Sequence, residues 1–384
     1  NFAPLKRQGS VCIAVPGIWH LMIARVFGYS GSNKNIFSQH GNFTMYKTSI
    51  ALAGTLFGAA LIAGHSSPTL AQSIKAETAG PGCPHTVMIL SAKYASRAGV
   101  NIQVNEGKTL TKSAMLVAQK KIDIASFVPA PYVFMKKGVA MYKKLGQKRS
   151  SAMAANLRGM YGYECGFYHP IVWDKSPIKK WSDLKGKKVF TGPPSGAAAV
   201  MSESFIRAMT GFEPNKEYTA VRLNWGSGQQ AMRDGQLDAY VRPMTVPSAM
   251  MEELVGIRPV RLLEVTKADT AKSGFKKMVG VPGRGVGKLP ANTYKGIVNN
   301  RTDQILPSFG LTQIAGAHVP DDVIYKITKG YFDNIAEIHK ANPWLANMSR
   351  KNPFSVLNVP LHPGAYKYFK EIGVKVPKRL MPPA

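Results

Sequence analysis

The feature that most constrains the fold of this chain is a repeated alternation between helix-like and strand-like segments. Residues 85–98 have the pattern of a helix, residues 100–104 alternate as a strand does, a second helix runs to about residue 120, and residues 122–127 form a buried strand. The same order recurs later, with strand-like segments at 187–190, 218–224 and 237–241, a helix to about residue 209, and a loop at 225–228 that opens another helix. Such alternation predicts βαβ units and a largely parallel sheet.

The strands that close these two stretches resemble each other. Lys-Ile-Asp-Ile-Ala at 121–125 and Gln-Leu-Asp-Ala-Tyr at 236–240 each follow a helix, and the prolines Pro129 and Pro243 come soon after them. We therefore predict an α/β fold with two similar lobes. No low-complexity linker separates the lobes, which favours a chain that crosses between them more than once. A further helix is predicted at 321–340.

The chain is strongly basic. Its 384 residues include 50 Lys and Arg against 21 Asp and Glu, a formal net charge of +29. Excess positive charge favours anionic partners without choosing among nucleic acids, membrane surfaces and small anions. The basic residues are scattered among glycine, proline and apolar residues rather than gathered in one long block, so we expect no nucleic-acid binding.

A targeting segment is predicted near the start of the chain. Residues 45–71 have a short basic start, an apolar run and a small-x-small ending at Thr69-Leu70-Ala71, the order of a secretory signal peptide. The apolar run is shorter than the roughly 20 residues of a membrane span. Residues 1–44 fit no such pattern and are interpreted as an upstream extension from a miscalled start, the alternative being an extra anchor. Without these segments the chain keeps a charge of +24, because residues 1–71 hold five of the basic residues and none of the acidic ones.

The cysteines agree with export to an oxidising compartment. Cys12 lies before the predicted cleavage point, which leaves Cys83 and Cys165. These two either form one disulfide or remain separate thiols. They show no metal-ligand spacing.

Sequence motifs give no support for catalysis. The segment 280–289 has Pro282 where a phosphate-binding loop needs its first glycine. Gly226-Ser-Gly228 fits a loose dinucleotide pattern, but Asp238 follows too soon to be its acidic residue, which favours a plain strand-to-helix turn. Ser176-x-x-Lys179 contains a proline and is typical of a turn. His318, His339 and His362 lie in ordinary contexts. We expect neither enzyme activity nor a cofactor.

Three loops open helices at predicted strand ends. They are 80–82 (Gly-Pro-Gly), 107–109 (Gly-Lys-Thr) and 193–197 (Pro-Pro-Ser-Gly-Ala). Ligands of open α/β sheets bind outside the carboxyl ends of the strands, and the N-terminus of a helix favours an anion. The loops therefore predict a pocket for a small anion.

Residues 80–373 resemble the TAXI family of solute receptors for tripartite (TRAP) transporters. The resemblance is carried by the motifs at 183–189 (Asp-Leu-Lys-Gly-Lys-Lys-Val), 192–196 (Gly-Pro-Pro-Ser-Gly), 234–239 (Asp-Gly-Gln-Leu-Asp-Ala), 319–328 and 361–365. It implies the two-lobed type II periplasmic-binding-protein fold with crossover hinge strands, closing on a small anionic solute that is delivered to a membrane permease. The first two loops depart from the family pattern, with Cys83-Pro84-His85 in place of paired aromatics and Lys108 in place of a neutral residue.

Arg242, just past a strand end of the second lobe, is the predicted cation for the ligand, because a guanidinium grips a carboxylate with two bonds. The alternative for Arg242 is an ordinary position at the hinge surface. The full set of predicted ligand-binding residues is Gly82, His85, Lys108, Thr109, Tyr163, Pro194, Ser195, Gly196, Ala197, Trp225 and Arg242. Lys108 is a second candidate cation, and Tyr163 and Trp225 are candidate walls of the pocket.

The sequence thus predicts a periplasmic, monomeric receptor for a small organic anion, most simply a carboxylate, that works with TRAP permease subunits. Lobe 1 is expected at 72–170, lobe 2 at 171–275, and a return to lobe 1 with C-terminal helices at 276–384. The alternatives are a sensory protein that presents its ligand to a membrane signalling partner and an enzyme built on the same fold.

Overall fold

The computed structural model of the chain describes residues 72–383. The predicted extension 1–44 and signal peptide 45–71 lie outside the described residues. Within the described part, no helix combines the length and the apolar character needed to span a bilayer.

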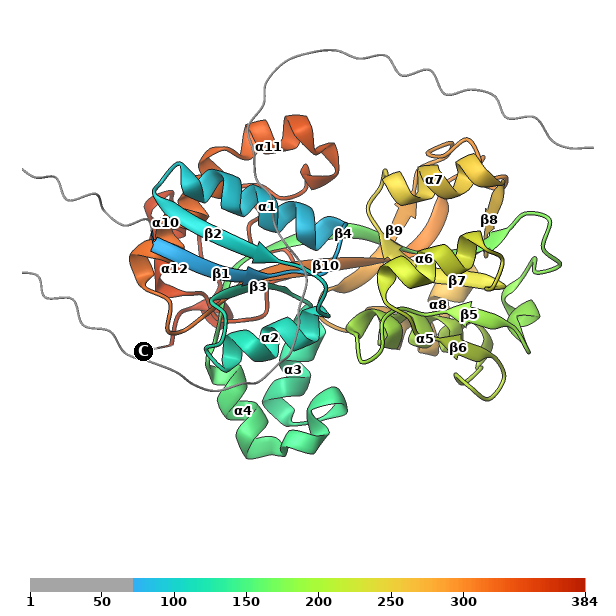
Figure 1. The fold of residues 1–384 in the computed structure, drawn as a ribbon, viewed down its shortest axis with the longest axis horizontal. Helices are drawn as coiled ribbons and strands as arrows, with labels where there is room; N and C mark the ends of the chain where they lie inside the picture. Colours follow the sequence, from blue (N-terminus) through green and yellow to red (C-terminus); the bar gives the residue numbers. More distant parts are fainter. Residues whose placement is uncertain (1–71, 384) are drawn as a thin grey trace, which may run out of the picture. The chain divides into compact units, whose positions relative to one another are not determined.

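A ten-stranded sheet runs through both lobes, and its order is mirrored about two long central strands (Figure 1). The first half contains β2 (Val100–Asn105), β1 (Gln72–Glu77), β3 (Ile124–Phe127) and β10 (Gln304–Gly316). The second half contains β6 (Thr219–Val221), β5 (Lys188–Phe190), β7 (Ala239–Met244) and β4 (Leu157–Trp173). Off this path, β8 (Val260–Leu262) pairs with β4, and β9 (Arg284–Leu289) pairs with β10.

Each half is parallel at its outer strands and antiparallel toward the centre. β1 pairs in parallel with β2 and β3, and β5 does so with β6 and β7. β10 and β4 run antiparallel to these strands and to each other. β3 and β7, which begin within the similar segments 121–125 and 236–240, hold equivalent places in the two halves. This strand order confirms the predicted two-lobed α/β fold of the type II periplasmic binding proteins, and β4 and β10 are its crossover strands.

Helices cover both faces of each half. Around the first half lie α1 (Cys83–Ser96), α2 (Leu110–Ala118), α3 (Pro129–Lys137), α4 (Gln147–Ala155), α10 (Asp321–Asp333), α11 (Ile335–Ala341) and α12 (Pro363–Glu371). Around the second half lie α5 (Ala197–Thr210), α6 (Trp225–Arg233), α7 (Ala249–Ile257), α8 (Lys267–Ala271) and α9 (Ser273–Val279). Short 3₁₀ turns are η1 (Ala140–Leu145), η2 (Trp181–Leu184), η3 (Pro343–Leu345) and η4 (Lys378–Leu380).

Two local predictions are wrong. The predicted loop at 225–228 is the first turn of α6, because the side chain of Asn224 accepts a hydrogen bond from the backbone N–H of Ser227 and caps the helix. The predicted single helix at 321–340 is divided into α10 and α11 at Asn334, whose side-chain amide donates to the carbonyl of Gly330.

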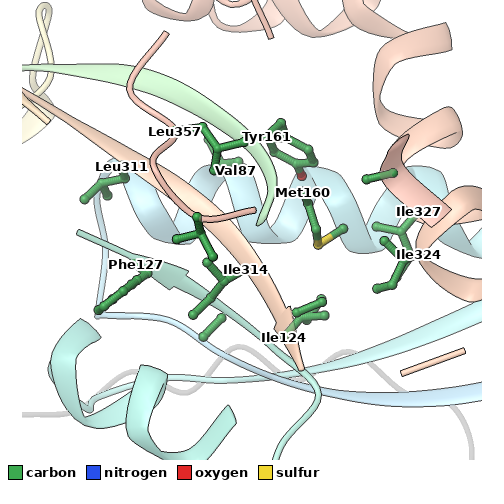
Figure 2. Packing of buried hydrophobic residues seen from close by; sticks show 14 of the residues in the cluster. Val87, Ile124, Phe127, Met160, Tyr161, Leu311, Ile314, Ile324, Ile327 and Leu357 are labelled. Atoms are coloured by element: carbon green, nitrogen blue, oxygen red, sulfur yellow. The ribbon is translucent and has the colours of Figure 1, made fainter. Parts of the chain in front are cut away.

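The core of lobe 1 is built around the aromatic ring of Tyr161 on β4 (Figure 2). This ring stacks on Tyr331 of α10 at 5.1 Å and meets Phe332 edge to face at 5.4 Å. Its hydroxyl lies 2.6 Å from that of Ser91 on α1, so the buried polar atom is satisfied. Burial of each such large side chain stabilises the lobe by about 1.5–3 kcal/mol.

Lobe 2 has a separate core on each face of its half-sheet. One contains Trp181 and Phe205, with ring centroids 4.6 Å apart, and the other contains Phe190 stacked on Tyr240 at 4.6 Å. A Cβ atom on Gly228 would lie 2.1 Å from the ring of Phe190. The glycine of the loose dinucleotide motif therefore allows α6 to pack closely on the sheet.

Candidate functional site

A cavity of about 430 Å³ lies between the two lobes. Lobe 1 contributes the loop 79–82 and the first residues of α1 and α2, and lobe 2 contributes the starts of α5, α6 and α7 together with the end of β7. The volume falls within the range of pockets that hold small organic ligands.

Within residues 72–383, six helices begin at this cavity. The residues that line it include Gly82 and Cys83 of α1, Thr109 and Leu110 of α2, Val128 before α3, Gly196 and Ala197 of α5, Trp225 of α6, and Ser248 and Ala249 of α7. Five of these helices have no acidic residue in the first turn, α7 with Glu252 being the exception. The first N–H groups of a helix have no partner within the helix, and a helix start carries partial positive charge, so the cavity favours an anion. In α6 and α7 one of these N–H groups is capped, by Asn224 and Ser248, and α1 and α3 have a proline in the first turn.

Arg242 is the most buried cation of the cavity wall. Arg242 is only 9% exposed, and one of its guanidinium nitrogens donates to the hydroxyl of Tyr240 at 2.9 Å. The guanidinium lies over the ring of Trp225, with its central carbon 4.7 Å from the ring centroid. Its Nε has no hydrogen-bond partner, and no carboxylate among the described residues forms an ion pair with it. A buried, uncompensated cation of this kind favours a bound anion.

His169 lies beside Arg242, as its direct partner in the pairing of β4 with β7. Its side chain is fully buried, and Nδ1 lies 2.9 Å from the carbonyl of Phe167. Burial lowers the pKa of His169 to about 4, so the imidazole is neutral at neutral pH. At neutral pH, the positive charge of the pair His169 and Arg242 therefore lies on Arg242 alone.

Arg284, at the start of β9, is a second guanidinium in the cavity wall. It donates to the carbonyl of Met278 at 3.2 Å, and within residues 72–383 no carboxylate pairs with it. Burial lowers the pKa of this arginine from its ordinary value. No sequence pattern singled out Arg284, because it follows a glycine in a turn-rich segment among many other basic residues.

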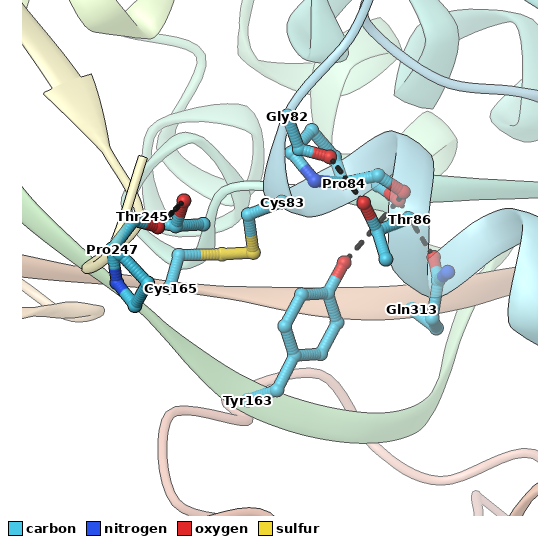
Figure 3. Close-up of a disulfide and its surroundings, with 10 residues drawn as sticks. Gly82, Cys83, Pro84, Thr86, Tyr163, Cys165, Thr245, Pro247 and Gln313 are labelled. Atoms are coloured by element: carbon cyan, nitrogen blue, oxygen red, sulfur yellow. Dashed lines mark hydrogen bonds between the residues drawn. A yellow bond between two sulfur atoms is a disulfide. The ribbon is translucent and has the colours of Figure 1, made fainter. Parts of the chain in front are cut away.

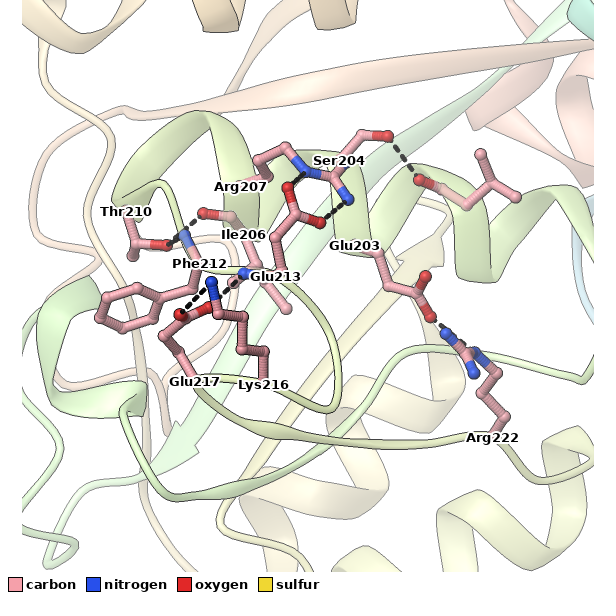
Figure 4. A network of polar contacts seen from close by, with 11 residues as sticks. Glu203, Ser204, Ile206, Arg207, Thr210, Phe212, Glu213, Lys216, Glu217 and Arg222 are labelled. Atoms are coloured by element: carbon pink, nitrogen blue, oxygen red, sulfur yellow. Dashed lines mark hydrogen bonds and ion pairs between the residues drawn. The ribbon is translucent and has the colours of Figure 1, made fainter.

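The rest of the wall is mainly apolar. Its large side chains are Tyr168, Met201, Trp225, Met250, Phe309 and Trp344. The acidic residues of α5 and its surroundings are paired elsewhere: Glu203 accepts from Arg222 at 2.7 Å, and Arg207 pairs with Glu213 (Figure 4). In the described structure, no Asp or Glu lines the cavity.

Six of the eleven predicted ligand-binding residues line the cavity. They are Gly82, Thr109, Gly196, Ala197, Trp225 and Arg242. Pro194 and Ser195 belong to the same loop as Gly196 but do not line the cavity, whereas Pro193 does.

The other three predicted residues, His85, Lys108 and Tyr163, lie away from the cavity wall. Lys108 forms an ion pair with Glu77 at 2.5 Å, since a carboxylate buried at the end of β1 requires a cation. His85 lies 2.8 Å from the carboxylate of Glu106. Tyr163 is fully buried in the core of lobe 1.

A disulfide joins Cys83, the first residue of α1, to Cys165 on β4 (Figure 3). Of the two alternatives for these cysteines, the structure therefore contains the disulfide. Both residues are 3% exposed, and Cys83 lines the cavity. Beneath the bond, the hydroxyl of Tyr163 donates to Ser126 at 3.3 Å. The bond thus attaches the start of α1 to a crossover strand.

The serine and histidine residues considered for catalysis from the sequence have local structural roles. The hydroxyl of Ser176 accepts from the N–H of Ile178, as expected for a turn. His318 lies 3.1 Å from Asp123, and His362 caps α12 by accepting from the N–H of Gly364. Within the described part of the chain, no three His, Cys, Asp or Glu side chains are grouped as metal ligands.

Several solved structures are similar to this chain at low sequence identity. The periplasmic aliphatic sulphonate-binding protein of Escherichia coli is 14% identical, with 78% of each chain covered and a TM-score of 0.39. A TRAP periplasmic solute-binding protein from Sulfitobacter sp. NAS-14.1 with bound β-D-galacturonate is 9% identical, with 79% of this chain and 88% of that chain covered and a TM-score of 0.41. The periplasmic ectoine-binding protein of Halomonas elongata is 13% identical, with coverage of 78% and 90% and a TM-score of 0.39.

The strand order described above establishes the fold independently of these three likenesses. A family model provides the identification. It matches residues 86–373, which include nearly all elements of both lobes. The chain belongs to the NMT1-like family.

Proposed function

We propose that this protein is a periplasmic receptor that binds a small organic anion, a carboxylate, between its two lobes. The observation that carries the proposal is the buried guanidinium of Arg242, which faces a cavity surrounded by helix starts and has no carboxylate partner among residues 72–383. A bound carboxylate supplies the missing negative charge and accepts hydrogen bonds from the free N–H groups.

Binding energetics require both lobes. Micromolar affinity corresponds to about 8.2 kcal/mol. A charge-assisted hydrogen bond contributes about 1.5–3 kcal/mol, and a helix start contributes about 0.3–1 kcal/mol to an anion. One arginine and one helix are therefore insufficient. Contacts from α1 and α2 of lobe 1 and from α5 and Arg242 of lobe 2 supply the remainder when the lobes close on the ligand.

The cavity wall favours a receptor over an enzyme on the same fold. Its hydroxyl groups have no imidazole or carboxylate beside them in the wall, and Cys83 is held in a disulfide. Nucleophilic catalysis requires a base within hydrogen-bond reach of the nucleophile. The described lining residues offer no such pair.

The partner in this proposal is a TRAP-type membrane permease. Support comes from the motifs at 183–189, 192–196 and 234–239, which resemble those of the TAXI receptors. The predicted signal peptide at 45–71 supports a periplasmic location. A monomeric receptor with two lobes suits this role, because closure changes the surface that the permease meets.

Thermal unfolding in the presence of carboxylates tests the proposal. A ligand at 100 times its dissociation constant stabilises the folded state by about 2.7 kcal/mol. We expect at least one of a panel of aliphatic, aromatic and dicarboxylic acids to raise the melting temperature, and native mass spectrometry to show a small anion carried through purification. A protein that no panel member stabilises and that carries no small molecule would contradict the proposal.

A further inference from the structure

The charged side chains that line the cavity are all of one sign. The charged side chains in its wall are those of Arg242 and Arg284, and neither has a carboxylate partner among residues 72–383. Six helix starts add partial positive charge. The nearby buried carboxylate, that of Glu77, lies outside the wall; one of its oxygens pairs with Lys108, and the other has no hydrogen-bond partner among the described residues.

This arrangement has no place for a cationic group. The ammonium of an α-amino acid is held by a carboxylate, by aligned carbonyl groups or by the faces of aromatic rings, and it is repelled by other cations in a poorly hydrated site. Arg242 already lies over the face of Trp225. The helix starts present N–H groups rather than carbonyls. Two carbonyls of the wall, those of Gly82 and Pro247, already accept from the hydroxyls of Thr86 and Thr245. For a zwitterion, the unfavourable burial of the ammonium therefore offsets the favourable binding free energy of the carboxylate.

The remaining wall requires an apolar surface on the ligand. Trp225, Trp344, Phe309 and Tyr168 supply aromatic faces, and Met201 and Met250 supply flexible apolar contacts. A short polar dianion leaves most of this surface without contact.

We infer that the ligand is a carboxylate with an aromatic or branched aliphatic body and no amino group. This inference rests on the proposed function, and it names the class of substrate that the same cavity takes. The two guanidinium groups and the helix starts bind the carboxylate, and the aromatic and methionine side chains enclose the body.

Matched pairs of compounds test the inference by isothermal titration calorimetry. 3-Phenylpropanoate differs from phenylalanine, and 4-methylpentanoate from leucine, only by the absence of the α-ammonium. We expect the member without the amino group to bind at least about tenfold more tightly in at least one pair, and more tightly than succinate, since like charge disfavours the ammonium.

The outcomes separate this inference from the proposed function. Equal or tighter binding of the amino acid in both pairs would overturn the inference and leave an anion receptor standing. Binding of succinate alone would also overturn it, because the apolar body would then be irrelevant. Failure of every carboxylate to bind would count against the proposed function itself.

A substitution at Met250 gives a second, independent readout. Its sulfur lies 3.0 Å from a guanidinium nitrogen of Arg242, and the residue is half-buried in the first turn of α7. Met250→Glu places a carboxylate on Arg242 and should reduce the preference for the compound without an amino group at least about tenfold. Met250→Gln has the same shape without charge and should retain that preference. Equal preferences in the two variants would contradict the inference.

Discussion

The hydroxyl of Thr111 on α2 donates to the carbonyl of Ser195 at 3.2 Å, and this bond joins lobe 1 to lobe 2. Ser195 has a positive φ of 58°, in the left-handed region that non-glycine residues seldom adopt. At the next residue, a Cβ atom on Gly196 would lie 3.6 Å from the methyl group of Thr109. The start of α2 in lobe 1 and the loop before α5 in lobe 2 thus meet at the edge of the cavity.

We expect Thr111→Val to weaken ligand binding, because it removes a bond between the lobes while keeping the side-chain shape. A hydrogen bond contributes about 0.5–1.5 kcal/mol, so the dissociation constant should rise about 2- to 10-fold in titration calorimetry. Thr270→Val, which removes the hydroxyl bond to Lys267 within α8, is the control and should bind as the natural protein does. Unchanged affinity in the Thr111 variant would show that this bond does not contribute to closure.

The disulfide should contribute strongly to stability. Cys83 and Cys165 are separated by 82 positions, and closing a long loop in the unfolded chain stabilises the folded state by about 2–5 kcal/mol. Reduction with dithiothreitol should lower the free energy of unfolding by that amount in urea titrations. The double variant Cys83→Ser, Cys165→Ser should show the lower stability and no response to the reductant. A natural protein that reduction leaves equally stable would contradict this expectation.

Stability should fall as the pH is lowered from about 6.5 to 4. Burial lowers the pKa of His169 and of His362 to about 4, so in this window the unfolded chain binds protons that the folded chain does not. Each histidine therefore contributes up to about 3 kcal/mol above pH 6.5, and this contribution is lost as the pH falls to the folded-state pKa.

Urea unfolding at several pH values checks this expectation. His362→Asn keeps an acceptor for the N–H of Gly364 and removes the titrating group, so the variant should lose less stability between pH 6.5 and 4 than the natural protein. An identical pH dependence would show that His362 is not held neutral in the folded state.

Local sequence patterns predicted the positions of many outer strands and helices in each lobe. β2 and α1 appear nearly where hydrophobic periodicity placed them, because their burial follows the two-residue and helical repeats. β4 could not be predicted in this way, since it is buried almost throughout and contains several glycines and a proline. Gly162 is explained by tertiary structure: a Cβ atom there would lie 2.9 Å from the backbone nitrogen of Leu357, nearly 200 positions later in the chain.

The candidate site also contains some residues that local sequence patterns could suggest and others that only the tertiary structure explains. The spacing of strands and helices was enough to suggest Arg242 and the loop at 193–197, because the fold places strand ends and helix starts at one edge. It was not enough to show that Arg284 lines the cavity and that Lys108 does not. Lys108 pairs with Glu77 of β1, and Arg284 reaches the cavity from the start of β9. Both facts depend on contacts between distant segments.

Titration calorimetry of Arg242→Gln, with a carboxylate that stabilises the natural protein, tests the central claim most directly. The account predicts at least tenfold weaker binding, since a charge-assisted bond contributes about 1.5–3 kcal/mol. It also predicts an unchanged or higher melting temperature without ligand, because the variant no longer buries an unpaired charge. Arg258→Gln, which removes a guanidinium over Trp173 on another part of lobe 2, should leave the affinity unchanged. Unweakened binding by the Arg242 variant would contradict the account.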